Sequence, residues 1–177
     1  MVAASSTPAA SGNVVLIGMP GVGKSTLGVL LAKLTSRNFI DTDVFIQAQE
    51  GRALQAIIDG DGVGVFRAIE ERCVSALQCR HTVIATGGSV VYSEWAMAHL
   101  QSVGVIVHLH LPLAALRRRL VDFGSRGVVM APGQSLASLF AERDPLYRRY
   151  ATVTVDCTGL NHEAAVRAIA AATGVGR

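Results

Sequence analysis

The sequence has few cysteines, few aromatic residues and no long apolar run. Its three cysteines, Cys73, Cys79 and Cys157, form no C-x-x-C pair and belong to no His/Cys cluster. A sparse, odd count of this kind is typical of reduced thiols and predicts a cytoplasmic protein. Aromatic residues make up only 5% of the chain, which disfavours a surface that stacks nucleic-acid bases. No apolar stretch is long enough to cross a bilayer, so no membrane partner is expected.

A strong excess of charge of one sign is also missing. The formal net charge of +3 suits a protein that handles phosphates and carboxylates, and it is too small to indicate nucleic acid as a partner. Residues 1–12 are rich in Ala and Ser but lack the basic and apolar regions of a signal peptide, so we expect a disordered N-terminal extension. Residues 13–177 are expected to form a single domain.

What the sequence does contain is an alternation of short β-rich runs and longer helical patterns. Strands are predicted at 14–17, 38–41, 82–86, 105–109 and 152–155. Helices are predicted at 24–36, 94–102, 113–121, 136–150 and 163–173, and several more within 44–79, broken at Gly51 and around 60–62. This order predicts an α/β fold with a mostly parallel five-stranded sheet flanked by helices. Ligands of such folds bind beyond the C-terminal ends of the strands.

The first predicted strand is followed by a phosphate-binding loop. Residues 18–25 read GMPGVGKS, which matches G-x-x-x-x-G-K-[ST] between a strand and a helix. Backbone N–H groups of such a loop surround phosphates, Lys24 can reach the β- and γ-phosphates, and the Ser25 hydroxyl can ligate Mg²⁺. The predicted nucleotide-binding residues of this segment are Gly21, Val22, Gly23, Lys24, Ser25 and Thr26. The pattern therefore predicts ATP as co-substrate and Mg²⁺ as cofactor.

Two carboxylates end the second predicted strand, in the run Asp41-Thr42-Asp43. One could lie near Mg²⁺ while the other meets an acceptor hydroxyl as base or orienting group. The alternative is a helix cap, in which Thr42 or Asp43 caps the helix that follows. The residues themselves leave both readings open.

Three further segments could recognise an acidic acceptor. Arg67 lies on a predicted helix with Glu70 and Glu71, where an ordinary surface ion pair is the alternative. Gly87-Gly88 follows the third strand and would let the backbone approach a ligand, or form a simple turn. The segment 142–150 carries three arginines, and a guanidinium fork matches a carboxylate, although a basic helix face is usually only solvated.

Together these motifs resemble the shikimate kinase family, in order and nearly in spacing, over about residues 13–173. The resemblance implies a P-loop kinase fold, a monomer and ATP-dependent phosphorylation of a hydroxyl on a small carboxylic acid, namely shikimate. It implies that Lys24 and Asp43 are catalytic, with Asp43 also contacting the acceptor hydroxyls. Arg67 and Arg143 would clamp the substrate carboxylate.

The same resemblance assigns the remaining site residues. Gly87 and Gly88 would lie beside the acceptor, and Asp41 would join Ser25 around Mg²⁺. Arg119 would lie near the adenine. Arg126 would be a catalytic, nucleotide-binding arginine on a lid at about 122–135, whose closure would exclude water.

The sequence departs from the family pattern at two places that border the acceptor. Gly127 follows the lid arginine in place of proline, and Ser89 replaces the third glycine of the Gly-rich turn. Ser89 could mark a differently decorated substrate, so another hydroxy acid such as homoserine is the alternative acceptor. A catalytically inactive nucleotide-binding regulatory module is the alternative of another class.

Four other residues are given structural roles. His108 and His110 share one face of a predicted strand and could ligate a metal, but no third ligand is evident, so packing is preferred. Tyr92 and Trp95, which follow the glycine turn, are predicted to pack in the core.

Overall fold

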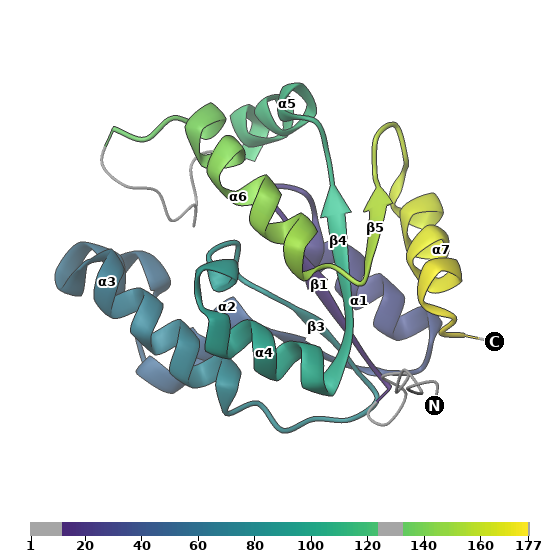
Figure 1. The fold of residues 1–177 in the computed structure, drawn as a ribbon, viewed down its shortest axis with the longest axis horizontal. Coiled ribbons are helices and arrows are strands. Elements are labelled where there is room, and N and C mark those ends of the chain that lie inside the picture. Colours follow the sequence, from purple (N-terminus) through teal and green to yellow (C-terminus); the bar gives the residue numbers. More distant parts are fainter. Residues whose placement is uncertain (1–11, 124–132, 177) are drawn as a thin grey trace, which may run out of the picture.

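A five-stranded parallel sheet forms the centre of the protein (Figure 1). The computed structural model describes residues 12–123 and 133–176, with the backbone alone for 120–123. The strand order is β2-β3-β1-β4-β5, and every neighbouring pair is parallel. The strands are β1 (Asn13–Ile17), β2 (Asn38–Asp41), β3 (Thr82–Ala85), β4 (Gly104–His110) and β5 (Val153–Asp156). The predicted sheet is thus confirmed, with strand ends within two residues of the expected positions.

Helices cover both faces of this sheet. The helices α1 (Lys24–Leu34) and α7 (His162–Thr173) lie on one face, and α4 (Glu94–Val103) and α6 (Leu136–Tyr150) lie on the other (Figure 1). Helix α5 (Leu113–Phe123) follows β4 and packs on α6. All five residues of β1 are buried, because this central strand has a helical layer on each side.

Two further helices and a short 3₁₀ turn complete the described fold. Helix α2 (Thr42–Glu50) follows β2 directly, α3 (Leu54–Ser75) packs on it, and η1 (Val90–Tyr92) follows β3. Helices α2 and α3 share a small core of their own, made of Ile46, Leu54, Ile57, Phe66, Ile69 and Cys73. The break expected around 60–62 is a kink inside α3, because Gly62 has the non-helical angles φ 87° and ψ 162°.

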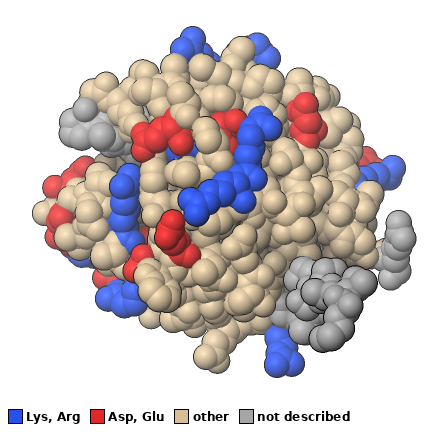
Figure 2. Space-filling view, in the orientation of Figure 1, with Lys and Arg blue, Asp and Glu red and all other residues tan. Residues whose placement is uncertain are grey.

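Some predictions fall outside what the structure describes. Residues 1–11 of the expected extension and 124–132 of the expected lid are outside the described residues, so both stay predictions. No helix within the described segments is both long and apolar enough to cross a membrane. On the face in Figure 2, basic and acidic side chains of the described residues are interspersed rather than gathered by sign.

Candidate active site

The phosphate loop is held in shape by glycine geometry and by its own lysine. Gly18 has φ 144°, and a Cβ there would lie 2.5 Å from the carbonyl oxygen of Leu109 on β4, so a side chain cannot fit. Gly23, at the start of α1, is left-handed with φ 104°. The Nζ of Lys24 donates to the carbonyl oxygens of Gly18 at 2.8 Å and Met19 at 3.1 Å. The loop therefore keeps a fixed curvature with the lysine folded along it.

Lys24 is a buried cation. Its side chain is 8% exposed, and burial lowers its pKa to about 8, against the opposing attraction of Asp43. Arg119 on α5 adds a second positive group, since its Nη1 donates to the carbonyl oxygen of Val22 at 3.0 Å. Arg119 therefore reaches the phosphate loop, and its expected place near the adenine stays a prediction.

The two carboxylates after β2 have separate roles. Asp41 is the N-cap of α2, and its Oδ1 accepts from the backbone N–H groups of Asp43 at 3.0 Å and Val44 at 3.3 Å. The sequence left open a cap by Thr42 or Asp43, and that alternative is wrong because the side chain of Asp41 makes the cap bonds. Asp43 is therefore not used as a cap, and burial raises its pKa to about 6, with Lys24 opposing the shift.

Thr42 and Gly87 join the ends of β2 and β3. The buried Thr42 hydroxyl accepts from the N–H of Gly87 at 3.0 Å. A Cβ on Gly87 would lie 2.7 Å from Oδ1 of Asp43 and 2.5 Å from Oε1 of Glu70, so a side chain there would displace both carboxylates. The two carboxylates therefore lie close to the same piece of backbone.

The sequence indicated Glu70 only as an ion-pair partner of Arg67, and the structure places it near Asp43 and Ser89. It is 3% exposed, and burial raises its pKa to about 7, although the hydrogen bond from Ser89 opposes this. Ser89 is itself buried and donates to Oε2 of Glu70 at 2.6 Å. The Ser89 hydroxyl is thus bonded to the protein, and the idea that it decorates the acceptor pocket has no support. Helical spacing from Phe66 and Cys73 could have placed Glu70 on the buried face.

Tyr92 brings the two predicted clamp arginines together. The guanidinium carbon of Arg67 lies 4.0 Å from the centre of the Tyr92 ring, and that of Arg143 lies 5.1 Å from it. The Tyr92 hydroxyl accepts from Nε of Arg143 at 3.1 Å and donates to Oε1 of Glu142 at 2.6 Å. Arg67 and Arg143 are 76 positions apart in sequence, yet one half-buried ring contacts both.

Comparison with known proteins agrees with this geometry. A family model described as shikimate kinase matches residues 20–173, which is most of the chain. The chain belongs to the shikimate kinase family. A shikimate kinase of Halorhodospira halophila is 40% identical over 147 residues, covering 81% of this chain and 83% of the relative. The shikimate kinase of Mycobacterium avium is 39% identical over 158 residues, covering 88% and 89%.

Solved structures lead to the same family. A structure of shikimate kinase from Acinetobacter baumannii in complex with shikimate has a TM-score of 0.76 and 30% identity, covering 89% of this chain and 88% of that one. Shikimate kinase from Aquifex aeolicus has a TM-score of 0.77 at 28% identity, covering 93% and 99%. As a member of this family the chain is an ATP-dependent kinase, and the predicted P-loop kinase fold is confirmed.

Arg143 is buried next to the glycine turn that follows β3. It is 1% exposed, and a Cβ on Gly88 would lie 3.1 Å from its Nη1. The carbonyl oxygen of Gly88 accepts from the hydroxyl of Tyr147, one turn further along α6, at 2.6 Å. Arg143 is therefore a buried side chain beside Gly88 and Tyr92 rather than a member of a solvated basic face.

The remaining predicted residues lie in different environments. Arg126 lies outside the described residues. Thr26 and Ser25 lie exposed in the first turn of α1, as a phosphate-binding segment requires. Trp95 was expected in the core and is 77% exposed, because it follows the N-cap Ser93 on the solvent side of α4. Tyr92 was also expected in the core, and it belongs to the arginine pair instead.

Proposed function

We propose that this protein transfers the γ-phosphoryl group of ATP to a hydroxyl of shikimate, giving 3-phosphoshikimate. The observation that carries the proposal is the pairing of Arg67 and Arg143 on the Tyr92 ring, beside Gly88 and at the same end of the sheet as Asp43. Two guanidinium groups match one carboxylate, and Asp43 supplies a carboxylate for a hydroxyl. The related kinase of Acinetobacter baumannii was solved in complex with shikimate, which supports the same acceptor.

On the acceptor side, binding orients the substrate for reaction. Arg67 and Arg143 hold the carboxylate, so that the ring hydroxyl is directed toward Asp43. Asp43 accepts the hydroxyl proton as the oxygen attacks the γ-phosphorus, and its pKa of about 6 keeps it ionised at neutral pH. Thr42 accepts from the N–H of Gly87 and Glu70 accepts from the Ser89 hydroxyl, and these two bonds hold the glycine turn near Asp43. Catalysis on this side thus depends on position and on one ionised carboxylate.

On the donor side, the phosphate loop holds the phosphates of ATP. Lys24 moves from the loop carbonyls to the β- and γ-phosphates, and its positive charge stabilises the charge that develops during transfer. Ser25 and Asp41 would hold Mg²⁺, because this hard cation prefers oxygen ligands. The cap of α2 uses only Oδ1 of Asp41, so Oδ2 could bind the ion. Magnesium would neutralise phosphate charge there. Arg119 would lie near the adenine.

The proposal extends to segments outside the described residues. The lid of about 122–135 with Arg126 would close over the phosphates and exclude water. Residues 13–177 would be one monomeric catalytic domain and residues 1–12 a disordered extension. The cytoplasmic location and the absence of a nucleic-acid or membrane partner stay predictions.

An acceptor panel tests the proposal. ADP release is measured with ATP and Mg²⁺ in the presence of shikimate, homoserine or gluconate. Shikimate should stimulate ADP release strongly, and the product should carry the new phosphate on its ring. Turnover with homoserine but not with shikimate would show that the kinase phosphorylates a different acceptor. ATP binding without turnover on any acceptor would favour the regulatory module and overturn the kinase assignment.

A further inference from the structure

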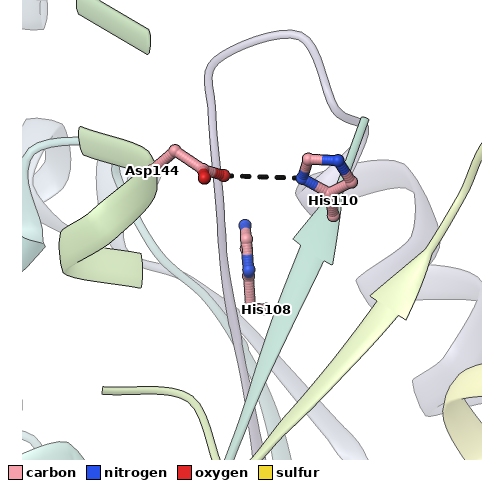
Figure 3. A group of neighbouring side chains, drawn as sticks. All are labelled: His108, His110 and Asp144. Carbon is pink, nitrogen blue, oxygen red and sulfur yellow. Dashed lines mark ion pairs between the residues drawn. The ribbon is translucent and has the colours of Figure 1, made fainter. Parts of the chain in front are cut away.

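A second group of polar side chains lies between β4 and α6, apart from the residues assigned to ATP and acceptor. His108 and His110 on β4 are joined there by Asp144 on α6, and one ligand atom from each lies within 4.8 Å of the other two. Figure 3 shows the Asp144 carboxylate directed at His110, with one ring nitrogen of His108 pointing into the gap between them. The third ligand that the sequence did not reveal is therefore supplied by a helix 34 positions later.

The polar atoms of this cluster lack ordinary partners. Nδ1 of His108, Nδ1 of His110 and Oδ1 of Asp144 are all buried, and none forms a hydrogen bond with the described residues. His108 is 1% exposed. Nδ1 of His110 and Oδ1 of Asp144 are 3.5 Å apart, too long for a good hydrogen bond. Buried polar atoms without partners are costly, so their convergence needs an explanation.

We propose that His108, His110 and Asp144 form a binding site for a divalent transition metal, with Zn²⁺ as the ion that fits best. Two imidazoles and one carboxylate are an established zinc ligand set, and imidazole disfavours Mg²⁺ and Ca²⁺. Ligand atoms of a tetrahedral zinc site are about 3.3 Å apart. The separation of 3.5 Å is close to this value, and the limit of 4.8 Å means that the ligand atoms would draw closer together when the ion binds.

The surroundings of the cluster hold its members in place. Oδ2 of Asp144 accepts from Nε of Arg148 at 2.7 Å, which leaves Oδ1 directed at the histidines. His108 stacks on Tyr147 with ring centres 5.3 Å apart and planes 24° apart. Carboxylates that ligate metals are commonly oriented by such outer hydrogen bonds.

The site would connect the sheet to the acceptor pocket. Asp144 adjoins Arg143, and Tyr147 bonds the carbonyl of Gly88. Metal bound between β4 and α6 would fix α6 against the sheet and so favour the folded state by mass action. The alternative is an ordinary His110–Asp144 ion pair, in which His108 only packs in the core and no metal binds.

Direct metal binding tests the inference in the whole chain without an affinity tag. Chelator-treated protein is titrated with ZnCl₂ by calorimetry in excess Mg²⁺, and with CoCl₂ while the visible spectrum is recorded. His110→Ala and Asp144→Asn remove ligands that are partly exposed and so leave the core intact. His162→Ala, an exposed histidine on α7, is the matched control. Asp41→Asn separates this site from the predicted Mg²⁺ site.

Wild-type protein, His162→Ala and Asp41→Asn should each bind one Zn²⁺ with similar affinity. His110→Ala and Asp144→Asn should bind it about 100-fold more weakly and lose the intense visible bands of low-symmetry cobalt. Thermal unfolding should show that zinc raises the Tm of wild type but not of the two ligand variants. Absence of zinc binding by wild type, or equal affinity in His110→Ala and Asp144→Asn, would overturn the site.

Discussion

The donor and acceptor halves of the site are built in opposite ways. The phosphate loop of the donor half comes from one run, residues 18–26, and is shaped by its own glycines and by Lys24. The proposed acceptor half brings Asp43 from α2, Arg67 and Glu70 from α3, Tyr92 from η1 and Arg143 from α6. A local motif such as the phosphate loop needs only the strand and helix on either side of it. A site assembled from four elements also needs neighbouring residues that bury and orient each charged side chain.

The largest effect is expected on removing the acceptor-side base. Asp43→Asn should lower kcat by about 10³-fold, because a positioned general base contributes about 10²–10⁴-fold. ATP affinity should change little, since the phosphate loop is a separate segment. Steady-state kinetics and ATP titration measure both, with the exposed Asp59→Asn as control. Wild-type turnover in Asp43→Asn would remove Asp43 from the mechanism.

The next effect concerns the buried arginine. Arg143→Lys should raise the KM for shikimate about 100-fold, because an ammonium group cannot reproduce the guanidinium fork or its bond to Tyr92. This corresponds to roughly 3 kcal/mol of lost binding. Arg149→Lys on the same helix is exposed and should match wild type. An unchanged KM in Arg143→Lys would place the substrate carboxylate elsewhere.

The pH dependence of kcat/KM tests one ionisable group from the acceptor half and one from the donor half. Asp43 must be ionised to act, and its raised pKa of about 6 means that kcat/KM for shikimate should fall about fivefold between pH 6 and pH 5. On the alkaline side Lys24, with a pKa lowered to about 8, loses its charge, so kcat/KM for ATP should fall above pH 8. A flat acid limb down to pH 5 would contradict the role of Asp43.

A smaller change is expected at the residue that orders the clamp. Tyr92→Phe keeps the ring under both guanidinium groups and loses the hydroxyl that accepts from Arg143 and donates to Glu142. We expect about a fivefold increase in the KM for shikimate, corresponding to ~1 kcal/mol for one hydrogen bond, with kcat nearly unchanged. Trp95→Phe, an exposed aromatic nearby, is the control. A drop in kcat alone would point to a direct part in the chemistry.

The smallest effect concerns stability. Burial raises the pKa of Glu70 to about 7 from its usual 4.5, so the folded state favours the protonated form. The stability that this gives is complete below pH 4.5 and is lost as pH rises through 7. Glu70→Gln should therefore be more stable than wild type at pH 8, by roughly 1 kcal/mol or about 2–4 °C in Tm. At pH 5 the gain in stability should be smaller. Thermal unfolding at the two pH values decides, and an equal shift at both would exclude ionisation as the cause.

The fold was largely predictable because its elements carry local signals. Strands such as β1 are continuous apolar runs, and α1 begins where the glycine loop ends. The prediction failed where the third dimension sets burial: Trp95 looks like a core residue in sequence and is exposed, while Tyr92 orders two arginines. The structure also gives Ser89 a different role from the one the sequence suggested, because its hydroxyl donates to Glu70.

The sequence by itself determined the phosphate loop, the strand-helix order and the family, because each is carried by residues close together in the chain. Only the tertiary structure decided how charges far apart in sequence meet. It put Arg67 and Arg143 on one ring, placed Asp43 and Glu70 together beside Gly87, and added Asp144 to the two histidines of β4. The reason is physical: pKa values and ligand sets depend on burial and distance, which sequence spacing does not report.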